Sequence, residues 1–167
     1  MYKTILHSIM ERNKELANRL HEVLLNGRWI ANTNYKLHIE NITWKQATQK
    51  IGTLNTIVAL TFHINYYLAG ILNVFKGGDL LIQDQYSFDM QPIESESDWK
   101  KLMDEFLVNS EAFIKEVANM PDHKLDEIFV DEKYGTYLRN IEGVIEHSYY
   151  HLGQISLIKK MIFEKDQ

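Results

Sequence analysis

Apolar residues recur with the period of an α-helix in four separate stretches of this chain. The first stretch runs from about Thr4 to Leu25 and stops at Asn26–Gly27, a pair that is typical of a helix C-terminus. The apolar positions that follow the helical period are Ile5, Ile9, Leu16, Leu20, Val23 and Leu24. We therefore predict a first helix over residues 4–25.

The second stretch begins with a capping box. Thr43 and Gln46 have the spacing at which a hydroxyl and an amide satisfy the first backbone donors of a helix. We expect this helix to continue to Phe75, with Gly52 dividing it. The second N-cap would then be one of two polar residues, Thr53 or Asn55.

The same stretch has no charged side chain between residues 52 and 75, and about 20 such residues suffice to span a bilayer. Polar side chains that would be costly to place in lipid are nevertheless scattered through it: Asn55, Thr56, Thr61, His63, Asn65 and Asn73. This pattern favours the central helix of a bundle, and we expect no membrane association.

The third and fourth stretches complete the helices. Ser95 is an N-cap candidate for a helix that runs to about Asn119, before Met120–Pro121. Its inward residues are expected to be Trp99, Leu102, Phe106, Phe113 and Val117. The fourth helix is predicted from 135–136 to about Phe163. Four long amphipathic helices in one chain predict an all-α fold, a four-helix bundle that forms a single domain over residues 1–167.

Long connections separate helix one from helix two and helix two from helix three. Residues 28–42 carry apolar side chains that we expect to pack on the bundle: Trp29, Ile30, Tyr35, Leu37 and Ile39. Residues 76–94 are too many for a tight turn, and connections of this length usually have a function or cover something. In residues 123–134, apolar and polar side chains alternate in part, which allows one extended segment but does not support a sheet.

Composition narrows the chemistry. The chain has 167 residues, 45% of them hydrophobic, and a net charge of −5 without a basic cluster, so nucleic-acid binding is not expected. It has no cysteine, which excludes disulfides, thiolate metal sites and a cysteine nucleophile. Histidines and carboxylates remain as the strong metal ligands. The first residues lack the layout of a signal peptide, and we expect a cytoplasmic protein.

Three histidines are predicted to face the interior. His147 and His151 are four residues apart on an apolar helix face, so their rings can reach one ion, and His63 lies in the middle of the second helix. The pair is not the zinc-protease H-E-x-x-H motif, because Ser148 occupies the position of the glutamate. The other histidines of the helices and connections (His7, His21 and His38) are expected to be partly exposed, with His38 at the surface.

Two segments resemble a known family. Thr56-Ile-Val-Ala-Leu-Thr-Phe-His63-Ile-Asn-Tyr-Tyr is similar to the single-histidine segment of the DinB-like superfamily of four-helix bundles, and Glu146-His147-Ser-Tyr-Tyr-His151-Leu-Gly-Gln154-Ile is similar to its H-x-x-x-H-x-G-Q-I segment. The superfamily includes metal-dependent hydrolase-like proteins and thiol S-transferases. The resemblance covers nearly the whole chain in helix order and implies that His63, His147 and His151 are metal ligands.

The expected function follows from these ligands. Three imidazoles leave a divalent ion, zinc or nickel by the resemblance, with an open position for water or a thiol. We expect a hydrolase or a small-thiol S-transferase that acts on a small molecule, and a homodimer. Gln154, Tyr66 and Tyr67 are placed to approach the ion's surroundings, although for the two tyrosines packing at the core or rim is the preferred interpretation. Glu146 is turned about 100° from His147 and should face solvent or pair with another helix. No general acid or base is identifiable.

A second hypothesis stays open at this point. The bundle could instead serve as a non-catalytic, dimeric interaction module whose histidine site is empty or vestigial. A buried trio of ionisable rings is costly to retain without a ligand, which favours the enzyme modestly.

Overall fold

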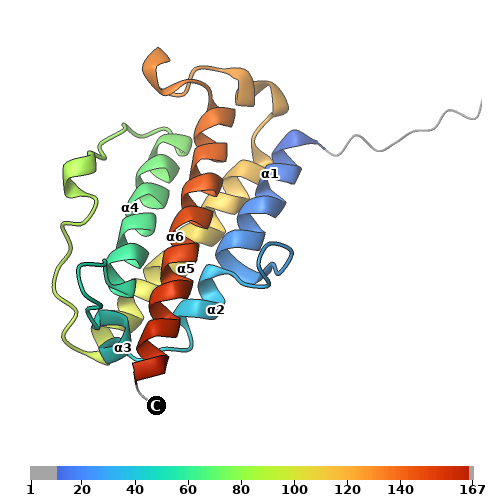
Figure 1. Cartoon of the computed structure of the whole chain (residues 1–167). Helices are drawn as coiled ribbons and strands as arrows, with labels where there is room; N and C mark the ends of the chain where they lie inside the picture. Colours follow the sequence, from blue (N-terminus) through green and yellow to red (C-terminus); the bar gives the residue numbers. More distant parts are fainter. Residues whose placement is uncertain (1–10, 166–167) are drawn as a thin grey trace, which may run out of the picture.

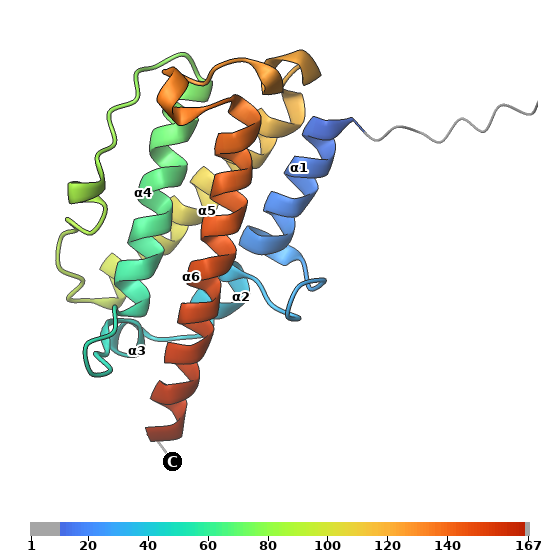
Figure 2. The ribbon, with the colours of Figure 1, turned by 45° about the horizontal axis from the view of Figure 1, so that its top comes forward.

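The structure, a computed structural model, describes residues 11–165 and is all-α, with four main helices packed together (Figures 1 and 2). The main helices are α1 (Arg12–His21), α4 (Ile57–Phe75), α5 (Glu96–Asn119) and α6 (Tyr137–Lys165). The short helices are α2 (Tyr35–Ile39) and α3 (Trp44–Thr48). Between residues 11 and 165 there is no strand, only one isolated bridge that pairs Ile128 with Thr136. The predicted all-α class is confirmed.

The direction of the helices explains the long second connection. Helices α1 and α6 run one way and α4 and α5 the other, so the chain must return the whole length of α4 before α5 can begin (Figure 1). Residues 79–93, which we call the strap, make this return along the outside of α4 and contain one 3₁₀ turn, η2 (Asp84–Tyr86). The strap is thus a requirement of the topology.

The predicted helix ends are mostly correct. Helix α1 continues as one π-helical stretch, η1 (Glu22–Asn26), and ends where the sequence predicted, whereas its predicted start and His7 lie outside the described residues. The Ser95 hydroxyl accepts a hydrogen bond from the Asp98 amide, as expected of an N-cap. Helix α6 extends two residues past Phe163.

The second N-cap prediction was wrong. The capping box of Thr43 and Gln46 is present, but it begins only the five-residue α3. Helix α4 is capped by Thr56, whose hydroxyl accepts from the Ala59 amide, and not by Thr53 or Asn55. The chain turns at Gly52, which has a φ of +53°. Thr56 directly precedes the apolar run, so a helix that is capped by Thr56 includes every buried residue of this run.

The core lies where the four helices meet. The five residues of α5 that were predicted to face inward are all buried: Trp99, Leu102, Phe106, Phe113 and Val117. The first connection packs on the core through Tyr35 and Ile39, and the Tyr35 hydroxyl donates to the Ser148 carbonyl at 3.1 Å. Trp29, however, is 84% exposed, so only part of this connection packs as predicted.

Helix α4 is the one helix in residues 11–165 that is long and apolar enough to cross a membrane. Most of its apolar part is buried inside the protein, as in the core helix of a helical bundle.

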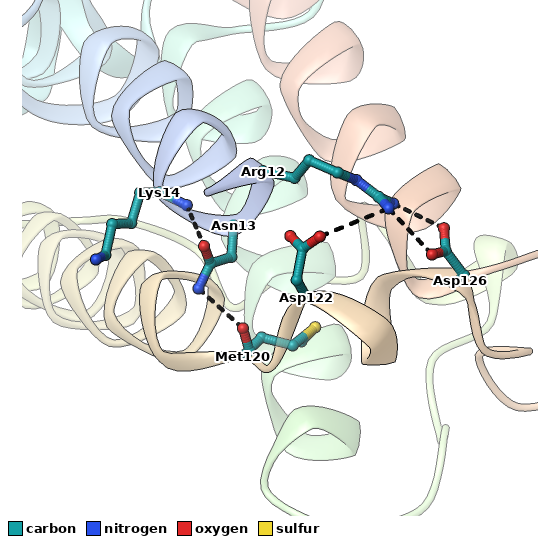
Figure 3. A network of polar contacts seen from close by, with 6 residues as sticks. All are labelled: Arg12, Asn13, Lys14, Met120, Asp122 and Asp126. Atoms are coloured by element: carbon teal, nitrogen blue, oxygen red, sulfur yellow. Dashed lines mark hydrogen bonds and ion pairs between the residues drawn. The ribbon is translucent and has the colours of Figure 1, made fainter. Parts of the chain in front are cut away.

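A polar network holds the start of α1 against the end of α5 (Figure 3). The Arg12 guanidinium donates two hydrogen bonds to the Asp126 carboxylate, at 3.0 and 2.7 Å, and lies 3.8 Å from Asp122. The buried Asn13 amide donates to the carbonyl oxygens of Ala118 and Met120, both at 2.9 Å. The Asn13 bonds satisfy carbonyl groups at the C-terminal end of α5. Together with the Arg12 contacts they hold the N-terminal end of α1 in place.

His38 is not the surface residue that the sequence suggested. Both of its ring nitrogens are shielded from solvent and have no hydrogen-bond partner among residues 11–165. Burial, followed by the charges of Lys159 and Lys160, lowers the pKa of His38 from 6.5 to about 4. The misassignment arose because a short helix, α2, turns this side chain toward α6, where Lys159 donates to the His38 carbonyl at 3.0 Å.

We expect His38 to make the fold acid-sensitive. The folded state keeps the ring neutral while the unfolded state binds a proton below pH 6.5, so stability should be lost as the pH falls from about 6.5 to about 4. The loss is at most about 3 kcal/mol and is expected to be about 2 kcal/mol, because the ring is only partly buried. Urea unfolding of the metal-free protein at pH 7.5 and 4.5 should therefore show a smaller difference in His38→Leu than in the unsubstituted chain, and equal differences would contradict the assignment.

Gly70 lets the strap approach α4. A Cβ atom at this position would overlap the Ile82 side chain of the strap, whereas a Cβ at Gly143 of α6 would meet nothing. Gly70→Ala should cost about 1 kcal/mol of unfolding free energy, because overpacking of about 1–3 kcal/mol exceeds a gain in helix propensity of about 1 kcal/mol. The matched Gly143→Ala variant should gain about 0.5–1 kcal/mol. Urea unfolding measures the free energy of unfolding of both variants. A higher free energy of unfolding in both would show that Ile82 does not need the space that Gly70 leaves.

Candidate metal centre

The three predicted histidines come together between two main helices. Helix α4 contributes His63, and α6 contributes His147 and His151 from successive turns. One ligand nitrogen from each ring lies within 4.8 Å of the others. His63 and His151 are buried and His147 is partly exposed, so the cluster sits at the edge of the core.

The facing atoms are the Nε2 nitrogens. His147 Nε2 lies 3.1 Å from His63 Nε2 and 2.9 Å from His151 Nε2. The ring planes are steeply inclined to one another, at 78°, 77° and 71° for the three pairs. Imidazoles bound tetrahedrally to one zinc ion, with bonds of about 2.0–2.1 Å, have nitrogens about 3.3–3.4 Å apart. For the two pairs that include His147, the observed spacing needs an adjustment of only a few tenths of an ångström.

Contacts on the far side of two rings decide where their protons are. His63 Nδ1 lies 3.2 Å from the Ser87 carbonyl oxygen, which can only accept, so this nitrogen carries the hydrogen. His151 Nδ1 lies 2.7 Å from Gln154 Oε1 in the same arrangement. In the neutral rings, therefore, both Nε2 atoms present a lone pair to His147.

The lone pairs on these Nε2 atoms need a partner that carries positive charge or donates a hydrogen. A hydrogen on His147 Nε2 could satisfy only one of the two lone pairs that face it. A cation between the rings satisfies all three nitrogens at once, and three imidazoles are a donor set that zinc, nickel, iron and copper accept. The residues present thus fit a divalent transition-metal ion.

The electrostatics keep the rings available as ligands. Burial lowers the pKa of His63 and of His151, and burial with the neighbouring rings lowers the pKa of His147 to about 4. The three imidazoles are accordingly neutral near pH 7, the form that binds metal. Asp84 acts in the opposite direction and raises the pKa of His63 and His147, so its negative charge reaches the cluster.

The strap covers one side of His63. The Phe88 ring stacks on the His63 ring, with centroids 4.2 Å apart and an angle of 12° between the planes. The Tyr67 ring stands edge-on to His63 and His147, at centroid distances of 5.1 and 5.3 Å. The Tyr66 hydroxyl bonds the backbone of Gln83 and thus holds the strap instead of a histidine. Of the three predicted supports, Gln154 and Tyr67 touch the histidine rings.

Other residues of the centre were not found from the sequence. Ser87 and Phe88 contact His63 from the strap, and Asp84 accepts a hydrogen bond of 2.7 Å from the Tyr67 hydroxyl. Burial, followed by this bond, raises the pKa of Tyr67 to about 12, so the phenol stays protonated and acts as a donor. The only signal in the sequence was the length of the connection, which does not say which of its residues reach the site.

Glu146 points to solvent, as predicted, with its side chain 60% exposed. Its ion pair, however, is made with Arg139 of the same helix, at 3.0 Å, and not with another helix. It takes no part in the histidine cluster. His21 is partly exposed, and His123, in the turn after α5, has a largely exposed side chain.

A scan against protein-family models, a search of curated proteins and a search of solved structures each found no match to this chain.

We expect Phe88 to fix the strap at the cluster. Phe88→Ala removes the stack on His63, a contact of about 0.5–1.5 kcal/mol, and should speed amide hydrogen exchange at Ser87 and Asp89, whose amides donate within the same turn. Tyr86→Ala is the matched control, because Tyr86 is similarly exposed and makes no aromatic contact within residues 11–165. Equal exchange in both variants would mean that the stack does not hold the strap.

Proposed function

We propose that His63, His147 and His151 bind one divalent metal ion, zinc or nickel, and that the chain is a metal-dependent hydrolase or small-thiol S-transferase of the DinB-like superfamily. The observation that carries the proposal is the convergence of three Nε2 atoms with two proton positions fixed by Ser87 and Gln154. The residues that match the superfamily's motifs are the same three histidines.

The ligand set favours a catalytic role over a structural one. A divalent ion held by three neutral imidazoles keeps its full charge and an open position, where it acts as a Lewis acid that lowers the pKa of water or of a thiol. The protein itself supplies orientation: the Ser87 carbonyl and the Gln154 amide hold two rings by their Nδ1–H groups. Tyr67, which stays protonated, holds Asp84 beside the cluster.

Asp84 supplies the carboxylate that the sequence interpretation lacked. It comes from the strap, it accepts from Tyr67, and its negative charge acts on two of the three histidines. In a hydrolase or a transferase this charge would stabilise positively charged groups beside the ion. Both reactions use the same residues, so both belong to the proposal.

The proposal predicts one bound ion per chain. Titration of the EDTA-treated protein with zinc or nickel in a calorimeter should give a stoichiometry of one, and an ion at about 100 times its dissociation constant should add about 2.7 kcal/mol of stability. For a chain of this length that is about 5–10 °C in melting temperature. His147→Ala should lose both effects.

His123→Ala is the matched control, because this histidine is exposed and lies outside the cluster. It should bind the ion as the unsubstituted chain does. If neither ion binds, or if the triple variant of His63, His147 and His151 to Ala keeps the ion-dependent rise, the metal site is refuted. Unchanged stability of that triple variant without any ion response would favour the non-catalytic interaction module.

A further inference from the structure

A cavity of about 340 Å³ lies between α4, the strap and α6, and its lining includes Tyr67, which contacts two histidines of the cluster. Tyr67 and Ile71 follow His63 at four-residue spacing on α4, and Asn140 precedes His147 by seven residues on α6. Because α4 and α6 are antiparallel, both sets lead from the cluster toward the same end of the protein (Figure 2). We call this cavity the Asp84 pocket, after the strap carboxylate that lines it.

Two polar residues of the lining, Asp84 and Asn140, present free acceptors to the pocket. Asp84 uses one carboxylate oxygen to accept from Tyr67, which leaves the other oxygen without a partner among the described residues. Both N–H groups of the Asn140 amide are spent on the carbonyls of Tyr134 and Thr136, so its free atom is the oxygen. No lysine or arginine lines the pocket.

The remaining lining is mostly apolar, with Gln83 and Tyr134 as neutral polar members that can also donate hydrogen bonds. Ile71, Leu80, Ile82 and Phe129 form the walls, from α4, the strap and the turn before α6. A volume of about 340 Å³ is at the lower end of the range for small-molecule sites. A ligand that fits this lining has a compact apolar body and donates hydrogen bonds from a positively charged group.

We propose that the Asp84 pocket binds a small organic ammonium ion, with its charged group at Asp84 and its apolar body against Ile71 and Ile82. If the function proposed above is correct, this pocket holds the part of the substrate that does not react. The substrate would then be an amine that offers a second, electron-pair-donating group to the ion at the histidines. The like charges of the ion and the ammonium group keep these two ends apart.

The preference for a cation can be tested without any metal. We would titrate the ¹⁵N-labelled full chain in EDTA with 2-phenylethylammonium, with the neutral 2-phenylethanol and with the anionic 3-phenylpropanoate. The ammonium compound should shift amides at residues 67–71 and 80–84 and bind about fivefold more tightly than the alcohol, and the anion should bind more weakly still. Equal binding of the three compounds, or shifts elsewhere on the protein, would overturn the proposal.

Asp84→Asn isolates the charge. The amide oxygen can still accept from Tyr67, so the variant should fold, which its amide spectrum checks, and it should lose the fivefold preference while binding the alcohol unchanged. Asp79→Asn is the matched control, because Asp79 is exposed in the same connection and does not line the pocket. A preserved preference in Asp84→Asn would refute the assignment.

The two proposals fail separately. Calorimetry with zinc tests the histidines and does not involve the pocket, whereas the titration in EDTA tests the pocket and does not involve an ion. Cation binding without metal binding would support the Asp84 pocket and refute the proposed metal-dependent enzyme. Metal binding without a preference for the cation would support the metal site and refute the Asp84 pocket.

Discussion

The hydrogen bond from His63 Nδ1 to the Ser87 carbonyl is the interaction on which the centre depends. It joins a helix of the core to an exposed strap, and it fixes the proton of His63 on the side away from the other histidines. Without it the ring could present either an N–H or a lone pair to the cluster. With it, and with the bond between His151 and Gln154, the Nε2 atoms of both rings present lone pairs that a cation between the three histidines would satisfy.

The strap owes its position to topology. Helices α4 and α5 run in the same direction, so the chain must travel back outside α4, past the residues that flank His63 (Figure 1). Helix α4 contacts the strap at three positions, the hydroxyls of Tyr66 and Tyr67 and the space beside Gly70. A connection that a bundle needs for geometric reasons has thereby become one wall of the histidine site and of the adjoining pocket.

The helices and the three histidines could be predicted because their signals are local or periodic. Apolar spacing gave α5 and its inward face, and the four-residue spacing of His147 and His151 placed both rings on one side of α6. The contributions of Ser87, Asp84 and Phe88 could not be predicted, because the strap has no period and its fold is set by contacts with α4. The burial of the His38 ring nitrogens was missed for the same reason, since it depends on how the short helix α2 packs against α6.

Charge divides the groove between α4 and α6 into two unlike halves. The cluster consists of neutral nitrogens whose low basicity, caused by burial, keeps them free of protons and open to a cation. The neighbouring pocket has the carboxylate of Asp84 as its one charged group, among neutral polar and apolar side chains. Tyr67 stands between them, with its ring against two histidines and its hydroxyl on Asp84, so a single side chain contacts both the cluster and the carboxylate of the pocket.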